Sequence, residues 1–310
     1  MFRKMRKALI LFSLLLTSCN STKQNWIDRD LHEGLYRLEY SDSFETYSTS
    51  KEPSNLRNTI NNLEQAKTYF DNVFNEDLNF AVLFIENENW NKYAFTPPPG
   101  MPQAYLEGNI VLGLEKSIIA KRAENQLHQF PESELNQLRK HFGNKIDLDL
   151  FYRDALAIHE LGHLYQFYKI QGKSQRKWLD EFFGALCQVA AAKNLEQSST
   201  FDQMDSYQKL LVKEDKWGDL PFKSLEQFEN NYFEIMKTGQ NYGWYQIQFY
   251  FKAKELYSKY GDNILKSFME FLIETNPRTV GKINNEELNQ LMMKAFDKEV
   301  LDTLEWKHDS

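Results

Sequence analysis

One short segment of the sequence has residue types and a spacing that suit metal chemistry. It is HELGH at 159–163, in which two histidines lie four positions apart and a glutamate follows the first. Residues i and i+4 share one face of a helix, so His159 and His163 can direct imidazole nitrogens at a single ion. Glu160 lies beside that face, where its carboxylate can take a proton from a water molecule activated by the ion. The segment therefore predicts a metal site with a base next to it.

A zinc ion in a hydrolase usually has three protein ligands and one open position. The metzincin pattern would place its third histidine at position 169, but that residue is Lys169, so the metzincin class is excluded. The next segment with helical spacing is 178–193, which follows a polar turn and carries Trp-Leu-Asp-Glu-Phe-Phe-Gly-Ala at 178–185.

HExxH followed by a helix with Trp-Leu-x-Glu-x-x-x-Ala resembles the gluzincin metallopeptidases, the superfamily of thermolysin and aminopeptidase N. The closest resemblance is to their compact peptidase MA-like members, which occur as bacterial lipoproteins. The resemblance implies that His159, His163 and Glu181 are ligands of Zn²⁺. It also implies that Glu160 is the general base, and it leaves Asp180 as the only rival to Glu181.

The same resemblance implies two further parts of the site. Family members place a tyrosine on a later helix, where its hydroxyl stabilises the oxyanion of the tetrahedral intermediate. The segment 241–246, Asn-Tyr-Gly-Trp-Tyr-Gln, offers Tyr245 as first choice and Tyr242 as second, with an aromatic packing cluster as the alternative interpretation. The segment 108–112 resembles the edge strand of the family, which would bind an extended peptide through backbone hydrogen bonds.

Two departures from the family pattern narrow the expectation. The Gly-x-Met-Glu-Asn segment with which aminopeptidases capture a free amine is missing from the sequence, which favours an endopeptidase or a very narrow peptidase. Thermolysin also has an acidic residue four positions after its glutamate ligand, and here that residue is Ala185. Histidine orientation must therefore come from other residues.

The N-terminus has the features of a bacterial lipoprotein signal. Residues 1–18 combine four positive charges with an apolar run at 8–16 that is too short to span a bilayer. The following Leu-Thr-Ser-Cys resembles a lipobox, which implies that Cys19 is lipidated and becomes the new N-terminus. Because Asn20 rather than aspartate follows, we expect the cell envelope, and the outer membrane if the bacterium has one.

Composition agrees with an anchored globular protein. The chain of 310 residues has a net charge of −7, and loss of the four positive charges of the signal takes it to −11. An acidic surface argues against nucleic-acid binding and is repelled by anionic lipid, so the acyl chains must provide the membrane attachment. We expect a monomer whose partner is a peptide or protein substrate.

The remaining pattern predicts an α+β, zincin-like fold with a small N-terminal mixed sheet, an HExxH active-site helix and a mostly helical C-terminal half. Strands are expected at 78–85 and 109–112, and a helix capped by Ser54 is expected before them. The sequence 41–55 is typical of a loop or weak strand. Further helical segments are expected at 147–170, 178–193, 205–213, 242–258, 263–275 and 285–296.

Together these expectations predict one domain after the signal peptide, and they predict its function. The function is a membrane-anchored zinc peptidase, and the alternatives are a non-catalytic, zinc-holding binding lipoprotein and a zinc hydrolase of non-peptide amides. The predicted parts are a signal peptide at 1–18, a lipid-anchored tether and N-terminal extension at 19–53, and a zincin-like domain at 54–310, with sheet and active-site helices at 54–193 and a helical subdomain at 194–310.

Overall fold

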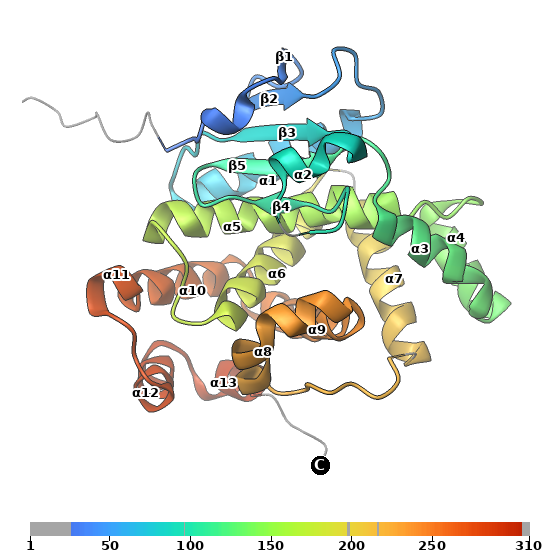
Figure 1. The fold of residues 1–310 in the computed structure, drawn as a ribbon. Helices are drawn as coiled ribbons and strands as arrows, with labels where there is room; N and C mark the ends of the chain where they lie inside the picture. The colour runs from blue at the N-terminus through green and yellow to red at the C-terminus, as the bar shows by residue number, and fades with distance from the viewer. Residues whose placement is uncertain (1–25, 96, 197–198, 216, 306–310) are drawn as a thin grey trace, which may run out of the picture.

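The computed structural model describes residues 26–95, 97–196, 199–215 and 217–305 (Figure 1). They form an α+β protein in which a small mixed sheet lies on one side of a larger helical region. This confirms the predicted fold class at that level. The predicted signal peptide and Cys19 lie outside the described residues. Within those residues, no helix is both long and apolar enough to cross a membrane.

The sheet has five strands in the order β1-β2-β3-β5-β4. β2, β3 and β5 are parallel, whereas β1 and β4 run antiparallel to their neighbours. The strands expected at 78–85 and 109–112 are confirmed as β3 and β5. The bounds are β1 Tyr36–Leu38, β2 Glu45–Ser48, β3 Ala81–Ile85, β4 Gln103–Ala104 and β5 Asn109–Gly113.

β1 and β2 lie within the predicted N-terminal extension at 19–53, and β2 falls in the stretch 41–55 where a loop or weak strand was expected. The strand pattern of β2 is weak because its buried side chains are Thr46 and Ser48 rather than aliphatic ones. The hydroxyl of Thr46 donates to the carbonyl of Leu38 at 2.8 Å, so burial of this polar group is compensated by a hydrogen bond. The compact domain therefore begins well before residue 54.

β3 is buried on both faces, as its continuous apolar run predicts. Val82 and Phe84 face the main core, which also contains residues of helices α1 (Arg57–Phe74) and α5 (Leu156–Ile170). Leu83 belongs to a smaller apolar cluster on the other face, together with aromatic residues of α2 (Trp90–Tyr93). α1 forms where a helix was expected, but Leu56 precedes its first residue and no side chain, including that of Ser54, caps it.

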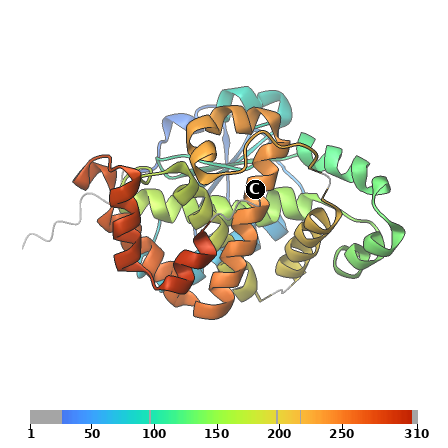
Figure 2. The ribbon, with the colours of Figure 1, turned by 90° about the horizontal axis from the view of Figure 1, so that it is seen from below.

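Helices make up the rest of the molecule, with α5 lying between the sheet and the C-terminal helices (Figure 1). α3 and α4 project from one end of the molecule, and α10 to α13 gather at the other (Figure 2). α2, α3, α4, α8, α11 and α13 were not expected from the sequence. The remaining bounds are α3 Ile118–Gln126, α4 Glu132–Phe142, α6 Lys177–Asn194, α7 Ser199–Glu214, α8 Leu225–Thr238, α9 Gln240–Tyr260, α10 Asp262–Glu274, α11 Pro277–Val280, α12 Asn285–Ala295 and α13 Lys298–Leu304.

α5 and α6 pack unusually closely because each contributes a glycine to the contact. A Cβ added at Gly162 of α5 would lie 2.5 Å from the Cβ of Cys187, and one added at Gly184 of α6 would lie 2.6 Å from Nε2 of His159. Both distances are shorter than van der Waals contact, so neither position accepts a side chain without a shift of its neighbour. The close approach brings α6 against the histidines of α5.

Candidate metal centre

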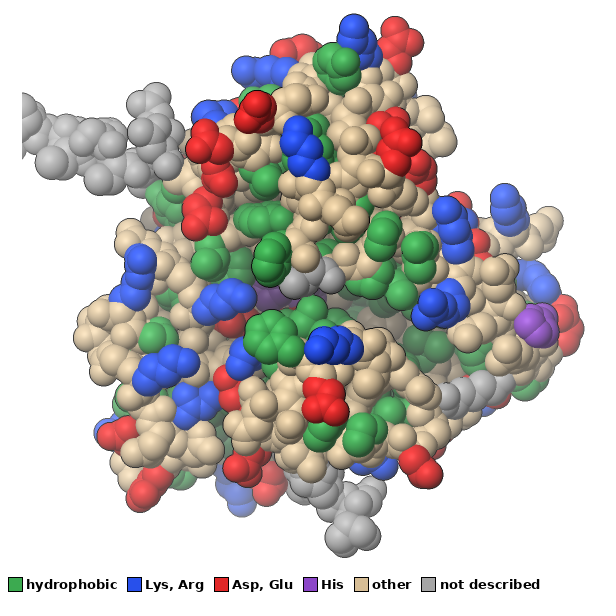
Figure 3. Space-filling view, viewed as in Figure 1, with side chains coloured by type: hydrophobic (Ala, Val, Ile, Leu, Met, Phe, Trp, Pro, Cys, Tyr) green, Lys and Arg blue, Asp and Glu red, His purple; other side chains and the backbone are tan. Residues whose placement is uncertain are grey.

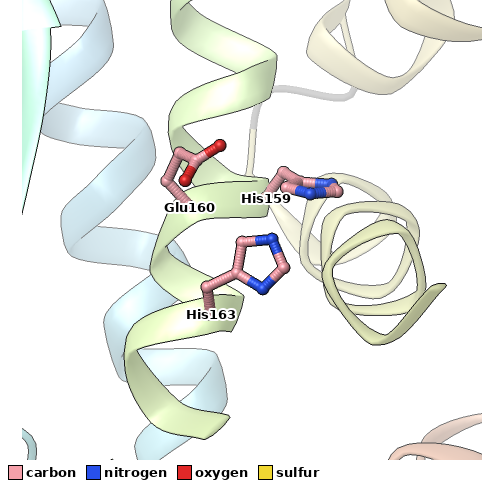
Figure 4. A group of neighbouring side chains, drawn as sticks. All are labelled: His159, Glu160 and His163. Atoms are coloured by element: carbon pink, nitrogen blue, oxygen red, sulfur yellow. The ribbon is translucent and has the colours of Figure 1, made fainter. Parts of the chain in front are cut away.

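α5 brings the HExxH residues together as its periodicity predicts. The ligand-capable atoms of His159, Glu160 and His163 all lie within 4.8 Å of one another. The two imidazole rings have centroids 4.6 Å apart and meet edge to face, and both side chains are buried (Figure 4). Glu160 is partly buried beside them. This group could hold a metal ion.

The start of α5 is fixed by buried polar contacts to the two helices on either side. A π-helical segment, Leu150–Ala155, precedes the helix, and the buried carboxylate of Asp154 accepts a hydrogen bond of 2.5 Å from Thr59 of α1. On the other side, the amide of Gln188 in α6 donates to the carbonyl of Ala155 at 2.9 Å. These bonds hold in place the turn that immediately precedes the histidines.

α6 places Glu181, and not its neighbour Asp180, next to the histidines. Oε2 of Glu181 lies 3.7 Å from Nε2 of His159. The carboxylate of Asp180 is directed elsewhere, since its Oδ1 accepts hydrogen bonds from the backbone N–H of Ser174 at 3.0 Å and from the amide of Gln166. Of the two candidate third ligands, the structure therefore brings Glu181 to the site.

Three donors from the C-terminal half hold the carboxylate of Glu181. Tyr232 of α8 donates to Oε1 at 2.8 Å, while Tyr242 and Gln246 of α9 donate to Oε2 at 3.1 and 2.8 Å. The sequence analysis missed Tyr232 and Gln246. Gln246 could have been found, because it lies four positions after Tyr242 and so shares its helix face. Tyr232 gave no signal, since α8 itself was not expected.

The structure does not bring Tyr245, the first choice for the oxyanion, to this group. Its side chain is fully buried, and its hydroxyl donates to the backbone carbonyl of Ser224 at 2.8 Å. Its ring packs against Phe228 of α8 with a centroid distance of 4.7 Å. Tyr245 thus belongs to the α8–α9 contact. Tyr242, the second choice, is the one of the two whose hydroxyl contacts the site.

The expected edge strand at 108–112 is not an edge. This segment forms β5, which pairs with β3 on one side and with β4 on the other. The terminal position in the sheet belongs to β4, and no described strand pairs with its second side. The backbone N–H of Ala104 in β4 instead donates to Oε2 of Glu160 at 2.7 Å. The short strand escaped notice because two residues give no periodicity.

Burial and neighbouring charges set the protonation states of the group. Burial, reinforced by the charge of His159, lowers the pKa of His163 to about 3, so its imidazole is neutral. Burial alone would raise the pKa of Glu181, but hydrogen bonding to His159 and the charges of both histidines outweigh it and lower that pKa to about 2. Burial raises the pKa of Glu160 to about 7, and the charge of Glu181 adds to this effect. The pKa values of Glu181 and Glu160 are thus shifted in opposite directions. Such a split is common in sites where one carboxylate stays ionised and the other transfers protons.

The tyrosines that contact Glu181 remain neutral donors. Burial, followed by the charge of Glu181, raises the pKa of both Tyr232 and Tyr242 well above the ordinary value. On the molecular surface, histidine is visible in a hollow with apolar side chains on both sides (Figure 3). His159 and His163 are 5% and 7% exposed, so neither side chain is completely closed off from solvent.

No family model, curated protein or solved structure matches this chain. The chemistry of the site itself must therefore carry the functional argument.

Proposed function

We propose that the protein is a zinc-dependent peptidase with a zincin-like arrangement of its site. The observation that supports this most strongly is that several groups lie close together. His159, Glu160 and His163 form a group that could hold a metal ion, and Glu181 lies 3.7 Å from His159. Glu160 is also hydrogen-bonded to the terminal strand of the sheet. A metal site, a base and a strand edge that can bind peptide are the three parts that hydrolysis of a peptide bond at a metal requires.

The residues present fit zinc. Two imidazoles and one carboxylate are the ligand set of catalytic zinc sites with an open fourth position. Zinc bonds to nitrogen and oxygen are roughly 2.0 to 2.2 Å long, so two donors on one ion are at most about 4.3 Å apart. The 3.7 Å between Nε2 of His159 and Oε2 of Glu181 lies within that limit. The neutral His163 and ionised Glu181 are also in the protonation states that ligands need.

The side chains of the site can then be given roles. Zinc, when bound, polarises the substrate carbonyl and makes water more acidic. Glu160 takes a proton from the attacking water, for which a pKa near the working pH is favourable. The neutral hydroxyl of Tyr242 is the proposed oxyanion donor, because Tyr242 is the one of the two tyrosines whose pKa is also raised by the charge of Glu160. It would turn from Glu181, to which it donates at 3.1 Å, to the oxyanion, while Tyr232 and Gln246 continue to hold Glu181.

β4 offers the surface on which a peptide would lie. The N–H of Ala104 points out of the sheet toward Glu160 rather than toward β5. An extended peptide that adds to this edge would hydrogen-bond to the backbone of β4 on the side where Glu160 lies. Recognition through backbone groups does not depend on a free amine, which agrees with an endopeptidase.

We further propose that the enzyme is held at the cell envelope by lipid on Cys19. In the Cys19→Ser variant the protein should move from the membrane fraction to the soluble fraction, because no helix of the described residues can span a bilayer. Fractionation followed by immunoblotting measures this. Retention of the variant in the membrane fraction would contradict the anchor.

The function itself is tested with the mature protein. Elemental analysis should give close to one zinc per chain, and incubation with an unbiased peptide library should give internal cleavages that a chelator prevents. Zinc without cleavage of any peptide would instead favour the non-catalytic binding lipoprotein. Cleavage of small amides but of no peptide would favour a hydrolase of non-peptide amides.

A further inference from the structure

His163 has a polar neighbour that the catalytic roles above do not use. Gln166, one turn further along α5, is fully buried, and its Oε1 lies 3.5 Å from Nδ1 of His163. The amide nitrogen of the same side chain donates to Oδ1 of Asp180 in α6. The three side chains thus form a buried row from the metal-binding face of α5 to the start of α6.

The chemistry of the row determines which way each group faces. Oδ1 of Asp180 also accepts the backbone N–H of Ser174 at 3.0 Å, so this oxygen acts as an acceptor. Gln166 must therefore direct its NH₂ group at Asp180 and its carbonyl oxygen at His163. A carbonyl oxygen can only accept, so the Nδ1 of His163 must carry the proton, which leaves Nε2 of that ring with its lone pair free.

We propose that Gln166 is a positioning residue that fixes the tautomer and ring orientation of His163 for metal binding, and that Asp180 fixes Gln166. The inference rests on the proposed zinc site. It gives Asp180 a role as an outer partner of the site instead of a ligand. It also supplies the histidine orientation that cannot come from position 185, where the chain has alanine.

The row serves one of the two histidines. The ring of His159 is in contact with Gly184 and faces Glu181, so it is held by packing and by a charged partner. His163 has its ring stacked on Phe167 with an interplanar angle of 6°. Stacking restricts the plane of the ring but does not distinguish its two nitrogens, and the amide of Gln166 makes that distinction.

The test is a zinc titration of the metal-free protein in competition with a chromogenic chelator. Gln166→Met keeps the volume of the side chain but removes the acceptor, and it should raise the Kd for zinc roughly 10- to 100-fold, as loss of an outer partner of a ligand does. The matched control is Gln208→Met. Gln208 is a buried glutamine of α7, a helix that carries none of the proposed site residues.

A pair of variants at Asp180 separates orientation from general destabilisation. Asp180→Asn keeps an oxygen that can accept both the amide of Gln166 and the N–H of Ser174, so it should leave the Kd for zinc within about threefold of the parent. Asp180→Leu removes this acceptor, leaves the amide of Gln166 without its partner and should raise the Kd roughly 10-fold. Thermal unfolding of each metal-free variant shows whether it is folded, and if Gln166→Met is not, the Asp180 pair decides.

The outcomes are distinct. Parental zinc affinity in folded Gln166→Met, an equal loss in Gln208→Met, or an equal loss in the two Asp180 variants would each overturn the proposal. Loss in Gln166→Met and Asp180→Leu, with affinity kept in Asp180→Asn, would support it. Because zinc affinity is measured without substrate, a protein that binds zinc in this way but cleaves no peptide would contradict the peptidase and leave the role of Gln166 intact.

Discussion

The helix pair that carries the proposed zinc ligands and the two helices that contact Glu181 from the other side are built differently. Every residue of α6 from 178 to 192 is buried, and α5 approaches it through the glycine contacts at Gly162 and Gly184. In α8, by contrast, two of fourteen residues are buried, and the backbone leaves helical geometry at Asn231. α8 and α9 reach the site through the hydroxyls and amide that bond to Glu181.

This difference indicates how the work of the site is divided. The proposed ligands are placed by close packing, which tolerates little displacement. Tyr232 comes from α8, which has few buried residues, and regions with few buried apolar contacts are the ones that open first. Tyr242 and Gln246 come from α9, which has seven buried residues, and they reach Glu181 through side-chain hydrogen bonds. Changes in the α5–α6 pair should therefore affect metal binding and stability, whereas changes in α8 and α9 should affect catalysis.

The largest effect is expected from removing a ligand in the tightly packed pair. His159→Ala or His163→Ala should abolish binding of zinc, because each leaves two of three ligands. Glu181→Gln should weaken zinc binding without abolishing it, since a neutral amide is a poorer ligand than a carboxylate. Elemental analysis after gel filtration measures both. Full zinc content in the two alanine variants would show that the ion, if any, lies elsewhere.

The role of α9 is tested by two of its tyrosines. Tyr242→Phe should lower the rate of peptide cleavage by roughly 10²- to 10³-fold, the effect of losing one oxyanion donor, with zinc still bound. Tyr245→Phe should change that rate little, because its hydroxyl bonds to Ser224 within the α8–α9 contact. Steady-state kinetics on a cleaved library peptide gives both rates. The opposite order would restore Tyr245 as the oxyanion residue.

A smaller effect should follow from widening the α5–α6 contact. Gly184→Ala pushes a methyl group against the ring of His159 and should lower the free energy of unfolding by about 1 to 3 kcal/mol. The same variant should also bind zinc more weakly, because the ring of His159 is displaced. Gly172→Ala is the control, since a Cβ there meets no atom within 4 Å. Chemical denaturation and zinc titration measure the two quantities. Equal stability of the two variants would mean that the contact is not tight.

The smallest effect concerns pH and the metal-free protein. The pKa of Glu160 is raised from 4.5 to about 7 by burial, so folding favours its protonated form, and this contribution to stability is lost as pH rises from 4.5 to 7. Glu160→Gln does not titrate there and should be the more stable protein above pH 7, by roughly 1 to 2 kcal/mol, since Glu160 is only partly buried. Below pH 4.5 the difference in unfolding free energy between the two proteins should disappear. Titration of His163 contributes equally to both proteins, so it does not affect this difference.

The sequence predicted those parts of the site that depend on local spacing. The arrangement of His159 and His163 follows from their spacing, because positions i and i+4 lie on the same face of any helix. Glu181 could be found because it lies near the start of a helix with a strong apolar pattern. Tyr245 and Tyr242 could not be ranked, because which face of α9 meets the site depends on where α8 packs. Gln166 likewise has no local signal, since its partner Asp180 belongs to another helix.

The fold shows the same limit. β3 and α1 follow from apolar runs and helical periodicity, whereas β1 and β2 are short, and the buried side chains of β2 are a threonine and a serine. The edge of the sheet was misplaced for a related reason. A strand of two residues such as β4 is defined by its pairing with β5. This pairing cannot be predicted from the sequence of either strand alone.

The most direct test of the central claim is a paired measurement of zinc content and peptide cleavage in the parent and in Glu160→Gln. The amide is almost isosteric with the carboxylate and can still accept the N–H of Ala104, so zinc and fold should be retained. Cleavage should fall roughly 10²- to 10⁴-fold, because the base that takes the proton from the attacking water is gone. If the zinc-loaded variant cleaves as fast as the parent, Glu160 is not the base and the proposed mechanism is wrong.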